Sequence, residues 1–178
     1  IVDSGQEYEH PALRTQFAYN YGSLASTYRS SILGDLCGEH GTAVAAVAVG
    51  LDRLTRDTVG AAFNALWMGG PAAFRNPTTN EICPLEGIST STIEVLQWAL
   101  NPDGNTLTSS DIPDVVNNSW GNSNNADECR SSFRNVVQAL DAAGIAVVFA
   151  AGNRGPDPST VNLPGGLNLD LVVPMSIG

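Results

Sequence analysis

The sequence predicts an α/β fold with a mostly parallel central sheet. Segments with helical periodicity alternate with short apolar segments, one of which has the continuous apolar pattern of a strand buried on both faces. Gly and Pro are frequent between these segments, as expected for turns. Of the 178 residues, 43% are hydrophobic and 15% are charged, so we expect one domain over residues 1–178.

The first half of the chain contains two expected strands and an apolar helix. "IVDSG", residues 1–5, has the pattern of a buried strand that ends in a turn. "HGTAVAAVAVG", residues 40–50, carries Ala and Val on all sides, which predicts a helix buried all round. "FNALWM", residues 63–68, is expected to be a strand.

A second helix is expected over residues 91–101, "STIEVLQWALN". Ser91 is followed three residues later by Glu94, which is the pattern of a capping box, and apolar residues then recur at helical spacing. The segments on either side, residues 70–90 and 101–112, are rich in Pro, Asn and Gly and are expected to be loops.

The second half repeats the alternation of strand and helix. Strands are expected within 113–121, 145–153 and 171–178. Between the first two, residues 128–144 predict a helix that closes at Gly144. The apolar face of this helix is expected to consist of Phe133, Val136, Val137 and Leu140.

Polar residues or glycines follow three of the expected strands, and a histidine begins the first expected helix. Ligands of parallel sheets bind at the carboxyl ends of the strands, so these are the places where a site is expected. A histidine that takes a proton needs a carboxylate to orient it, and Asp3 is placed to serve His40. Asn153, on a glycine turn, offers an amide that could stabilise an oxyanion.

Four motifs together resemble a known family. "VDSG" (2–5), "HGTAVA" (40–45), "NNSWG" (117–121) and "AAGN" (150–153) occur in the order and with the spacing seen in the subtilisin-like serine proteases, or subtilases. "HPAL" after the aspartate turn and "PDVVNNSWG" are closest to the bacillopeptidase F-like branch. The resemblance implies a three-layer subtilisin-like fold over nearly the whole chain.

The resemblance also implies a role for each matching residue. Asp3 would be the triad carboxylate, His40 the general base and Asn153 the oxyanion amide. A polypeptide substrate would bind as an extended strand along one edge of the site and against an opposite wall of the primary specificity pocket. The edge would consist of Ser119, Trp120 and Gly121, and the wall of Ala150, Ala151 and Gly152. We expect the floor of this pocket to lie outside the chain and the pocket to accept an apolar or medium-sized side chain.

The nucleophile that the family requires is not found. Subtilases carry it in a Gly-Thr-Ser segment followed by small residues and Pro, and no such segment occurs here. "GIST", residues 87–90, has the wrong order, Ser176 falls in the last expected strand, and Ser119 belongs to the substrate-binding edge. The chain is therefore expected to be a partial peptidase domain, truncated at both ends and inactive alone, whose partner is the C-terminal remainder of the domain.

Three functional readings remain open. The first is a serine endopeptidase that works through an Asp-His-Ser triad and an acyl-enzyme. The second is a non-catalytic homologue that binds peptides or serves as a scaffold. The third is a nucleotide-binding α/β domain with "DSG" as a phosphate turn, although no Gly-rich loop opens a helix after the first strand.

Composition argues against several partners. The net charge is −10 and all eight basic residues are Arg, so a nucleic-acid partner is not expected. No apolar run is long enough for a membrane helix. Cys37, Cys83 and Cys129 are too scattered for a paired zinc motif; they permit either a Cys83–Cys129 disulfide with one free thiol or three reduced thiols.

No metal ligand is assigned from the sequence. The resemblance permits calcium as a structural ion, and Asp157 with Asp170, or Asp103 with Asp111, could ligate one, but no loop has the alternating carboxylates of a dedicated site. His10 lies among acidic residues and is expected to be structural or at the surface. An extracellular or cell-envelope location is implied by the resemblance alone.

Overall fold

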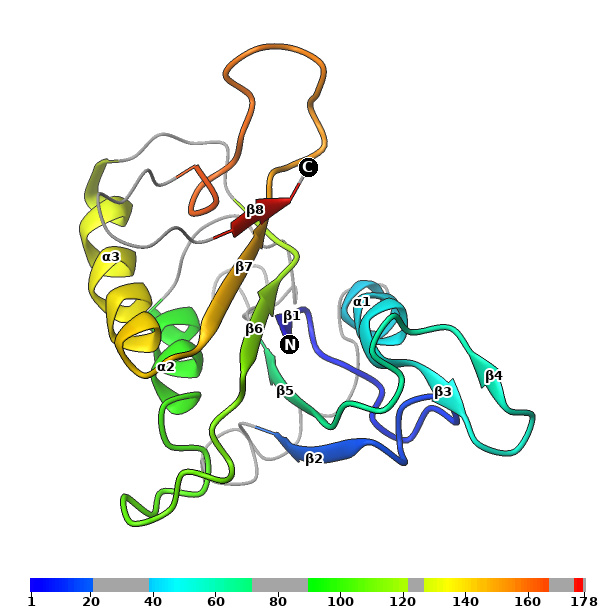
Figure 1. Ribbon diagram of the computed structural model, residues 1–178. Helices are drawn as coiled ribbons and strands as arrows, with labels where there is room; N and C mark the ends of the chain where they lie inside the picture. Colours follow the sequence, from blue (N-terminus) through cyan, green and yellow to red (C-terminus); the bar gives the residue numbers. More distant parts are fainter. Residues whose placement is uncertain (21–38, 72–89, 122–126, 167–174, 178) are drawn as a thin grey trace, which may run out of the picture. The chain divides into compact units, whose positions relative to one another are not determined.

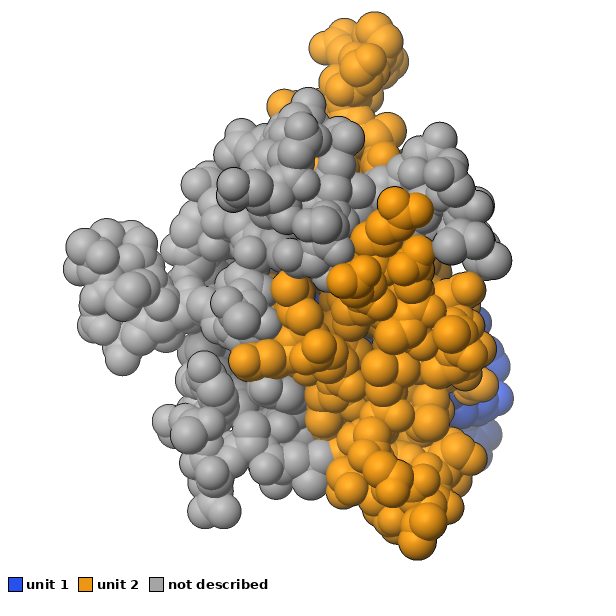
Figure 2. Space-filling model, turned by 90° about the vertical axis from the view of Figure 1, so that its left-hand side faces the viewer, with its two compact units in different colours: residues 1–84 blue, residues 85–178 orange. Residues whose placement is uncertain are grey.

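The computed structural model describes residues 1–20, 39–71, 90–121, 127–166 and 175–177. The chain divides into two compact units, Ile1–Pro84 and Leu85–Gly178, which are coloured separately in Figure 2. In both units parallel strands are combined with helices, so the predicted α/β class is confirmed.

The first unit contains a parallel sheet and a small hairpin. The sheet has the order β2 (Phe17–Asn20), β5 (Trp67–Pro71), β1 (Val2–Asp3). Two further strands, β3 (Leu51–Asp52) and β4 (Asp57–Thr58), pair antiparallel. The strand β1 was predicted from the sequence, whereas β2 and the hairpin were not.

The strand predicted at residues 63–68 begins later than expected, at Trp67. The preceding residues form turns, because the backbone amides of Ala61 and Ala62 donate to Val47 and Ala48 at the end of the first helix, 3.0 and 2.8 Å away. Pairing with the β2 side starts only at Trp67, whose backbone amide donates to the Gln16 carbonyl at 2.9 Å. A tertiary contact therefore overrides the strand propensity of residues 63–66.

The helix predicted at residues 40–50 is present as α1 (His40–Val49), but the prediction that it is buried all round is wrong. Only one stripe, Gly41, Ala45 and Val49, is buried, whereas Val47 is 67% exposed. The buried stripe packs into a cluster that includes Leu13 and Trp67. An even distribution of Ala and Val carries no information about which side faces this cluster.

The second unit is a parallel sheet of order β6-β7-β8 with two helices (Figure 1). Its strands are β6 (Val115–Asn118), β7 (Ala146–Ala150) and β8 (Met175–Ile177), and its helices are α2 (Thr90–Trp98) and α3 (Asp127–Ala142). The two helices lie side by side, and α3 packs against β7. The four apolar residues predicted for the face of α3 are all buried, and Gly144 after it has φ 81°, as expected for a C-terminal glycine.

The predicted limits of α2 need a correction. The helix includes Thr90, so Ser91 lies inside it and is not the cap, and it ends at Trp98 rather than at Asn101. Beyond Trp98 the backbone continues in turns, with Asn101 donating to the Trp98 carbonyl at 2.9 Å. Pro102 lacks an amide hydrogen and restricts the residue before it, which prevents the helix from continuing.

Candidate active site

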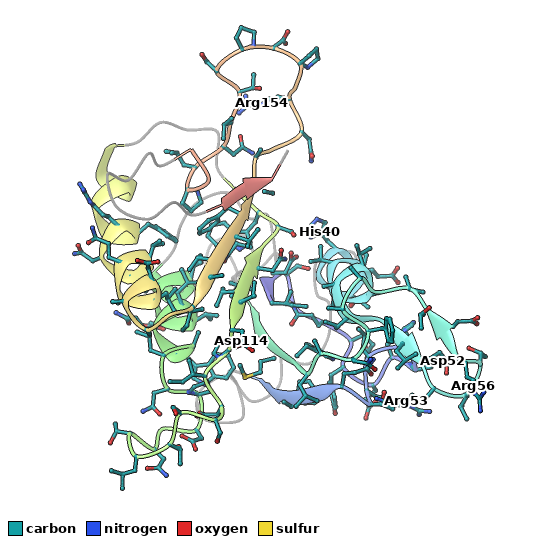
Figure 3. The ribbon with its side chains drawn as sticks, viewed as in Figure 1. His40, Asp52, Arg53, Arg56, Asp114 and Arg154 are labelled. Atoms are coloured by element: carbon teal, nitrogen blue, oxygen red, sulfur yellow. The ribbon has the colours of Figure 1, made fainter. Side chains whose placement is uncertain are left out.

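The first unit brings Asp3 and His40 together. Asp3 ends β1 and is fully buried, and His40 is the first residue of α1 with its side chain half exposed. His40 Nδ1 lies 2.7 Å from Asp3 Oδ1. Figure 3 shows His40 at the beginning of α1. Two residues 37 positions apart therefore form a direct imidazole–carboxylate contact.

This contact determines which nitrogen of His40 can act as a base. A carboxylate only accepts hydrogen bonds, so in the neutral imidazole Nδ1 carries the proton and Nε2 keeps its lone pair. Asp3 Oδ1 also accepts a hydrogen bond from the Ser4 backbone amide at 2.7 Å, which orients the carboxylate. With one partner buried and the other accessible, the pair has the features of a general base held by a carboxylate.

A close approach of two backbones holds α1 against the turn after β1. A Cβ atom at Gly41 would overlap the Gly5 carbonyl oxygen and lie 3.1 Å from Asp3 Cβ. The Gly41 amide donates to Ser4 Oγ at 3.0 Å, and the Glu7 amide donates to Thr42 Oγ1 at 2.9 Å. This close approach explains why a glycine follows His40: with any side chain at position 41, the helix could not come near enough for His40 to reach Asp3.

The second unit brings the other predicted residues together at the carboxyl ends of two neighbouring strands. β6 and β7 are parallel with Asn118 opposite Phe149, so Ser119–Gly121 and Ala150–Gly152 leave the sheet at the same edge. Asn118 is fully buried and its amide donates to the Val148 carbonyl of β7 at 3.1 Å, which ties the two strand ends together. Asn117 Nδ2 donates to Ser119 Oγ at 3.0 Å.

The side chain of Trp120 lies in the core of the second unit. It is 8% exposed and meets Phe133 of α3 and Phe149 of β7 edge-to-face, with ring centroids 5.9 and 5.7 Å away. Only the backbone of Trp120 can therefore belong to a substrate-binding edge.

Asn153 lies at the end of the wall segment. Gly152 before it has φ 104°, a conformation that a side chain other than glycine would adopt only with strain, and Asn153 itself is exposed. The turn thus presents an amide beyond the end of β7, where an oxyanion donor was predicted. Asn153 belongs to the second unit, and Asp3 and His40 belong to the first.

One residue that the sequence analysis missed contacts both predicted substrate-binding segments. A methyl group added at Gly121 would lie 2.8 Å from Asn162 Cβ, and one added at Gly152 would lie 2.8 Å from Asn162 Nδ2. An asparagine in "STVNLPGG" gives no signal of its own in the sequence, because turns commonly contain this residue.

The remaining predictions lie elsewhere or outside the described residues. His10 is exposed, and its Nδ1 accepts a hydrogen bond from the Ala12 amide at 3.2 Å. Cys37, Cys83 and Asp170, and the side chains of Cys129 and Ser176, lie outside what the structure describes.

The described residues contain no group of three or more His, Cys, Asp and Glu side chains that could hold a metal ion. The Asp103 carboxylate accepts hydrogen bonds from the Asn105 amide and the Thr108 hydroxyl at 2.7 and 3.0 Å. Asp111 Oδ2 accepts one from the Asp103 amide at 2.9 Å. Three of the four oxygens of this pair therefore have donors within the loop.

Known proteins are similar to this chain in sequence and in fold. Residues 1–177 match the family model described as "Subtilase family". Bacillopeptidase F of Bacillus subtilis (strain 168) is 31% identical over 182 residues, which cover 93% of this chain and 11% of that protein. The S41 psychrophilic protease has a similar structure, with a TM-score of 0.60 and 22% identity over 92% of this chain and 48% of that chain.

These similarities confirm the predicted subtilisin-like fold. The chain spans about half the length of the solved protease and about a tenth of bacillopeptidase F.

Proposed function

Because this chain belongs to the subtilase family, we propose that it forms the Asp/His/Asn part of a serine endopeptidase. The observation that carries the proposal is the 2.7 Å contact between His40 Nδ1 and the fully buried Asp3 carboxylate. The nucleophilic serine would come from outside these 178 residues, since no Gly-Thr-Ser segment occurs among them.

In the proposed reaction His40 acts first as a base and then as an acid. Nε2 takes the proton of the serine hydroxyl while the serine oxygen attacks the carbonyl carbon of the scissile peptide bond. The imidazolium is stabilised by Asp3 and returns the proton to the amine that leaves. Water then hydrolyses the acyl-enzyme by the same two proton transfers.

Asn153 would stabilise the negative charge that develops on the carbonyl oxygen. A side-chain amide on a turn of fixed conformation is oriented before the charge appears, so it needs no reorganisation during the reaction. The position of Asn153 after Gly152, whose φ is 104°, supports this role.

The substrate would be a polypeptide in extended conformation, bound along Ser119–Gly121. Pairing of an added strand with an exposed edge uses only backbone groups, so it is compatible with the burial of the Trp120 ring. Ala150, Ala151 and Gly152 would face the substrate from the opposite side. None of these steps requires a metal; calcium is proposed only as a structural ion.

An extracellular or cell-envelope location is proposed from family membership. None of the helices in the described part of the chain is long and apolar enough to cross a membrane. Fractionation of the source cells with an antibody against residues 1–178 would test the location, and signal confined to the cytoplasm would contradict it.

The test of the proposed activity is labelling of the full-length gene product with a fluorophosphonate, a probe that reacts with activated serines. The product should label, His40→Ala should abolish labelling, and His10→Ala should leave it unchanged because His10 is an exposed histidine with only a local hydrogen bond. The 178-residue chain alone should not label.

Two other results would change this view. Failure of the folded full-length product to label would favour a non-catalytic peptide-binding homologue. Labelling of the 178-residue chain alone would show that one of its own serines is the nucleophile.

A further inference from the structure

The loop between α2 and β6 brings two carboxylates together. Asp103 and Asp111 are eight residues apart, and the backbone amide of Asp103 donates to Asp111 Oδ2 at 2.9 Å. Residues 101–114 contain three aspartates and no basic residue. The loop lies at the amino-terminal end of β6 (Figure 1), so it is separated by the length of this strand from the proposed substrate-binding edge.

Asp111 is the buried member of the pair. Residues 104–110 are exposed, whereas Asp111 is only 9% exposed, and its Oδ1 is shielded from solvent without a hydrogen-bond partner. Among the residues that the structure describes, no basic side chain pairs with Asp103 or Asp111. A buried carboxylate oxygen without a partner is unfavourable, so this oxygen is expected to bind a group from outside the protein.

The loop also orients further oxygen atoms near this carboxylate. Asp103 Oδ1 accepts a hydrogen bond from the Asn105 amide at 2.7 Å, and Asp103 Oδ2 accepts one from the Thr108 hydroxyl at 3.0 Å. Asn105 Oδ1 accepts one from the Leu107 amide at 3.1 Å. Each of these acceptors has a second lone pair, so an ion could still bind to it.

The ligand chemistry of these side chains favours calcium. Ca²⁺ binds carboxylate, amide, carbonyl and water oxygens in a flexible geometry, whereas zinc and other softer metals favour nitrogen and sulfur ligands. Two carboxylates balance the charge of Ca²⁺, and the ion removes the repulsion between them. The described residues supply no third acidic ligand at this place, so neutral oxygens and water would complete the coordination.

We propose that Asp103 and Asp111, together with the Asn105 side-chain oxygen, form a structural calcium site that fixes the connection between α2 and β6. The loop is already held at both ends, since the Trp98 indole donates to the Pro102 carbonyl and the Ala146 amide donates to the Asp114 carbonyl, each at 2.9 Å. The ion would fix the exposed part between them. The site is independent of the proposed peptidase reaction.

Calorimetric titration of the full-length gene product with calcium tests the site. Asp111→Asn and Asp103→Asn should each bind one calcium ion fewer than the wild type. The site itself should bind with a Kd of about 10⁻⁴–10⁻³ M, as weak extracellular calcium sites do. Asp114→Asn is the matched control, because Asp114 carries the same charge on the same segment but is exposed at the start of β6, where Figure 3 labels it. It should bind as many ions as the wild type.

Terbium luminescence tests where the ion binds. Tb³⁺ replaces Ca²⁺ in proteins and emits when a nearby tryptophan is excited, and the Trp98 indole contacts the residue before Asp103. Asp111→Asn should lose part of the emission, and Trp98→Phe should lose the same part. Loss of this part in Asp111→Asn but not in Trp98→Phe would contradict a site in this loop.

Thermal unfolding provides a readout that holds even if Asp111→Asn is less stable than the wild type. A ligand that binds only the folded state raises Tm, so transfer from excess EDTA to about 10 mM calcium should raise the Tm of the wild type more than that of Asp111→Asn. Equal shifts in Tm, or equal numbers of bound ions, would overturn the proposal, and water would then be the partner of Asp111 Oδ1. Fluorophosphonate labelling is a separate measurement, so the proposed function would stand in that case.

Discussion

Gly41 contacts the backbone of Gly5 so closely that any side chain at position 41 would overlap the Gly5 carbonyl oxygen. This contact brings the first turn of α1 against the end of β1, and through it His40 Nδ1 comes within 2.7 Å of Asp3. The geometry of the proposed catalytic pair thus depends on two glycines that have no chemical role in the reaction.

Gly41→Ala should destabilise the protein and displace His40. Overpacking against the backbone should lower the free energy of unfolding by about 1–3 kcal/mol and slow fluorophosphonate labelling. Gly155→Ala is the control, because nothing lies within 4 Å of a Cβ at that position. Equal unfolding midpoints in urea for the two variants would contradict the close contact.

Asp3→Asn should preserve the fold and remove most of the activity. An amide in place of the carboxylate can hold His40 in the wrong tautomer, with Nε2 protonated, and kcat should fall about 10⁴-fold. Activity should be measured together with thermal unfolding. Loss of activity only in step with loss of folded protein would assign Asp3 a structural role instead.

Asn153→Ala should lower kcat and change KM little. The loss of one oxyanion donor costs about 10²–10³-fold in kcat, a magnitude known from subtilisin itself. Because Asn153 is exposed, the free energy of unfolding should stay within about 0.5 kcal/mol of the wild type. An equal decrease in rate for Arg154→Ala and Asn153→Ala would contradict the specific role of the amide.

Trp120→Ala should act through stability rather than through substrate recognition. The ring is 8% exposed and packs against Phe133 and Phe149, so its removal should lower the free energy of unfolding by about 3–5 kcal/mol. Trp120→Phe keeps an aromatic ring and should cost less. If Trp120→Phe alters the ratio of kcat/KM for substrates with Ala and with Phe before the scissile bond while stability is unchanged, the ring takes part in specificity.

Asp52 should make the hairpin of β3 and β4 sensitive to acid. The backbone hydrogen bond from the Leu54 amide to its carboxylate, 2.8 Å long, holds the pKa of Asp52 below its ordinary value of 3.8. The unfolded state therefore binds the proton more readily, so the stabilisation is present above pH 3.8 and is lost as pH falls through the folded pKa.

The difference in unfolding free energy between the wild type and Asp52→Ala should accordingly shrink below pH 3.8. Asp52→Asn keeps an acceptor for the Leu54 amide but has no group that titrates at position 52. The difference in unfolding free energy between Asp52→Asn and Asp52→Ala should therefore not vary with pH. Urea unfolding between pH 3 and pH 7 measures both quantities. If the difference in unfolding free energy between the wild type and Asp52→Ala is constant over this range, the role of the carboxylate is contradicted.

Local patterns were sufficient where one face of an element is strongly apolar. The four apolar residues of α3 and the closing Gly144 predicted both the helix and its buried face. The pairing of His40 with Asp3 was also predicted, because a histidine that takes a proton needs a carboxylate to orient it, and the two side chains are in contact.

Tertiary contacts decided what local patterns left undetermined. The Ala and Val residues of α1 are spread evenly, so only packing against Leu13 and Trp67 determines that Val47 faces outward. The start of β5 was displaced to Trp67 by hydrogen bonds from residues 61 and 62 to the end of α1.

The sequence by itself determined the α/β class, the family and the residues that are proposed to act in catalysis, because these depend on composition, periodicity and motif order. Only the tertiary structure decided that Trp120 is a core residue and that Asn162 meets Gly121 and Gly152. These contacts join residues far apart in the chain, and their distances depend on how strands and loops pack, which no local pattern encodes.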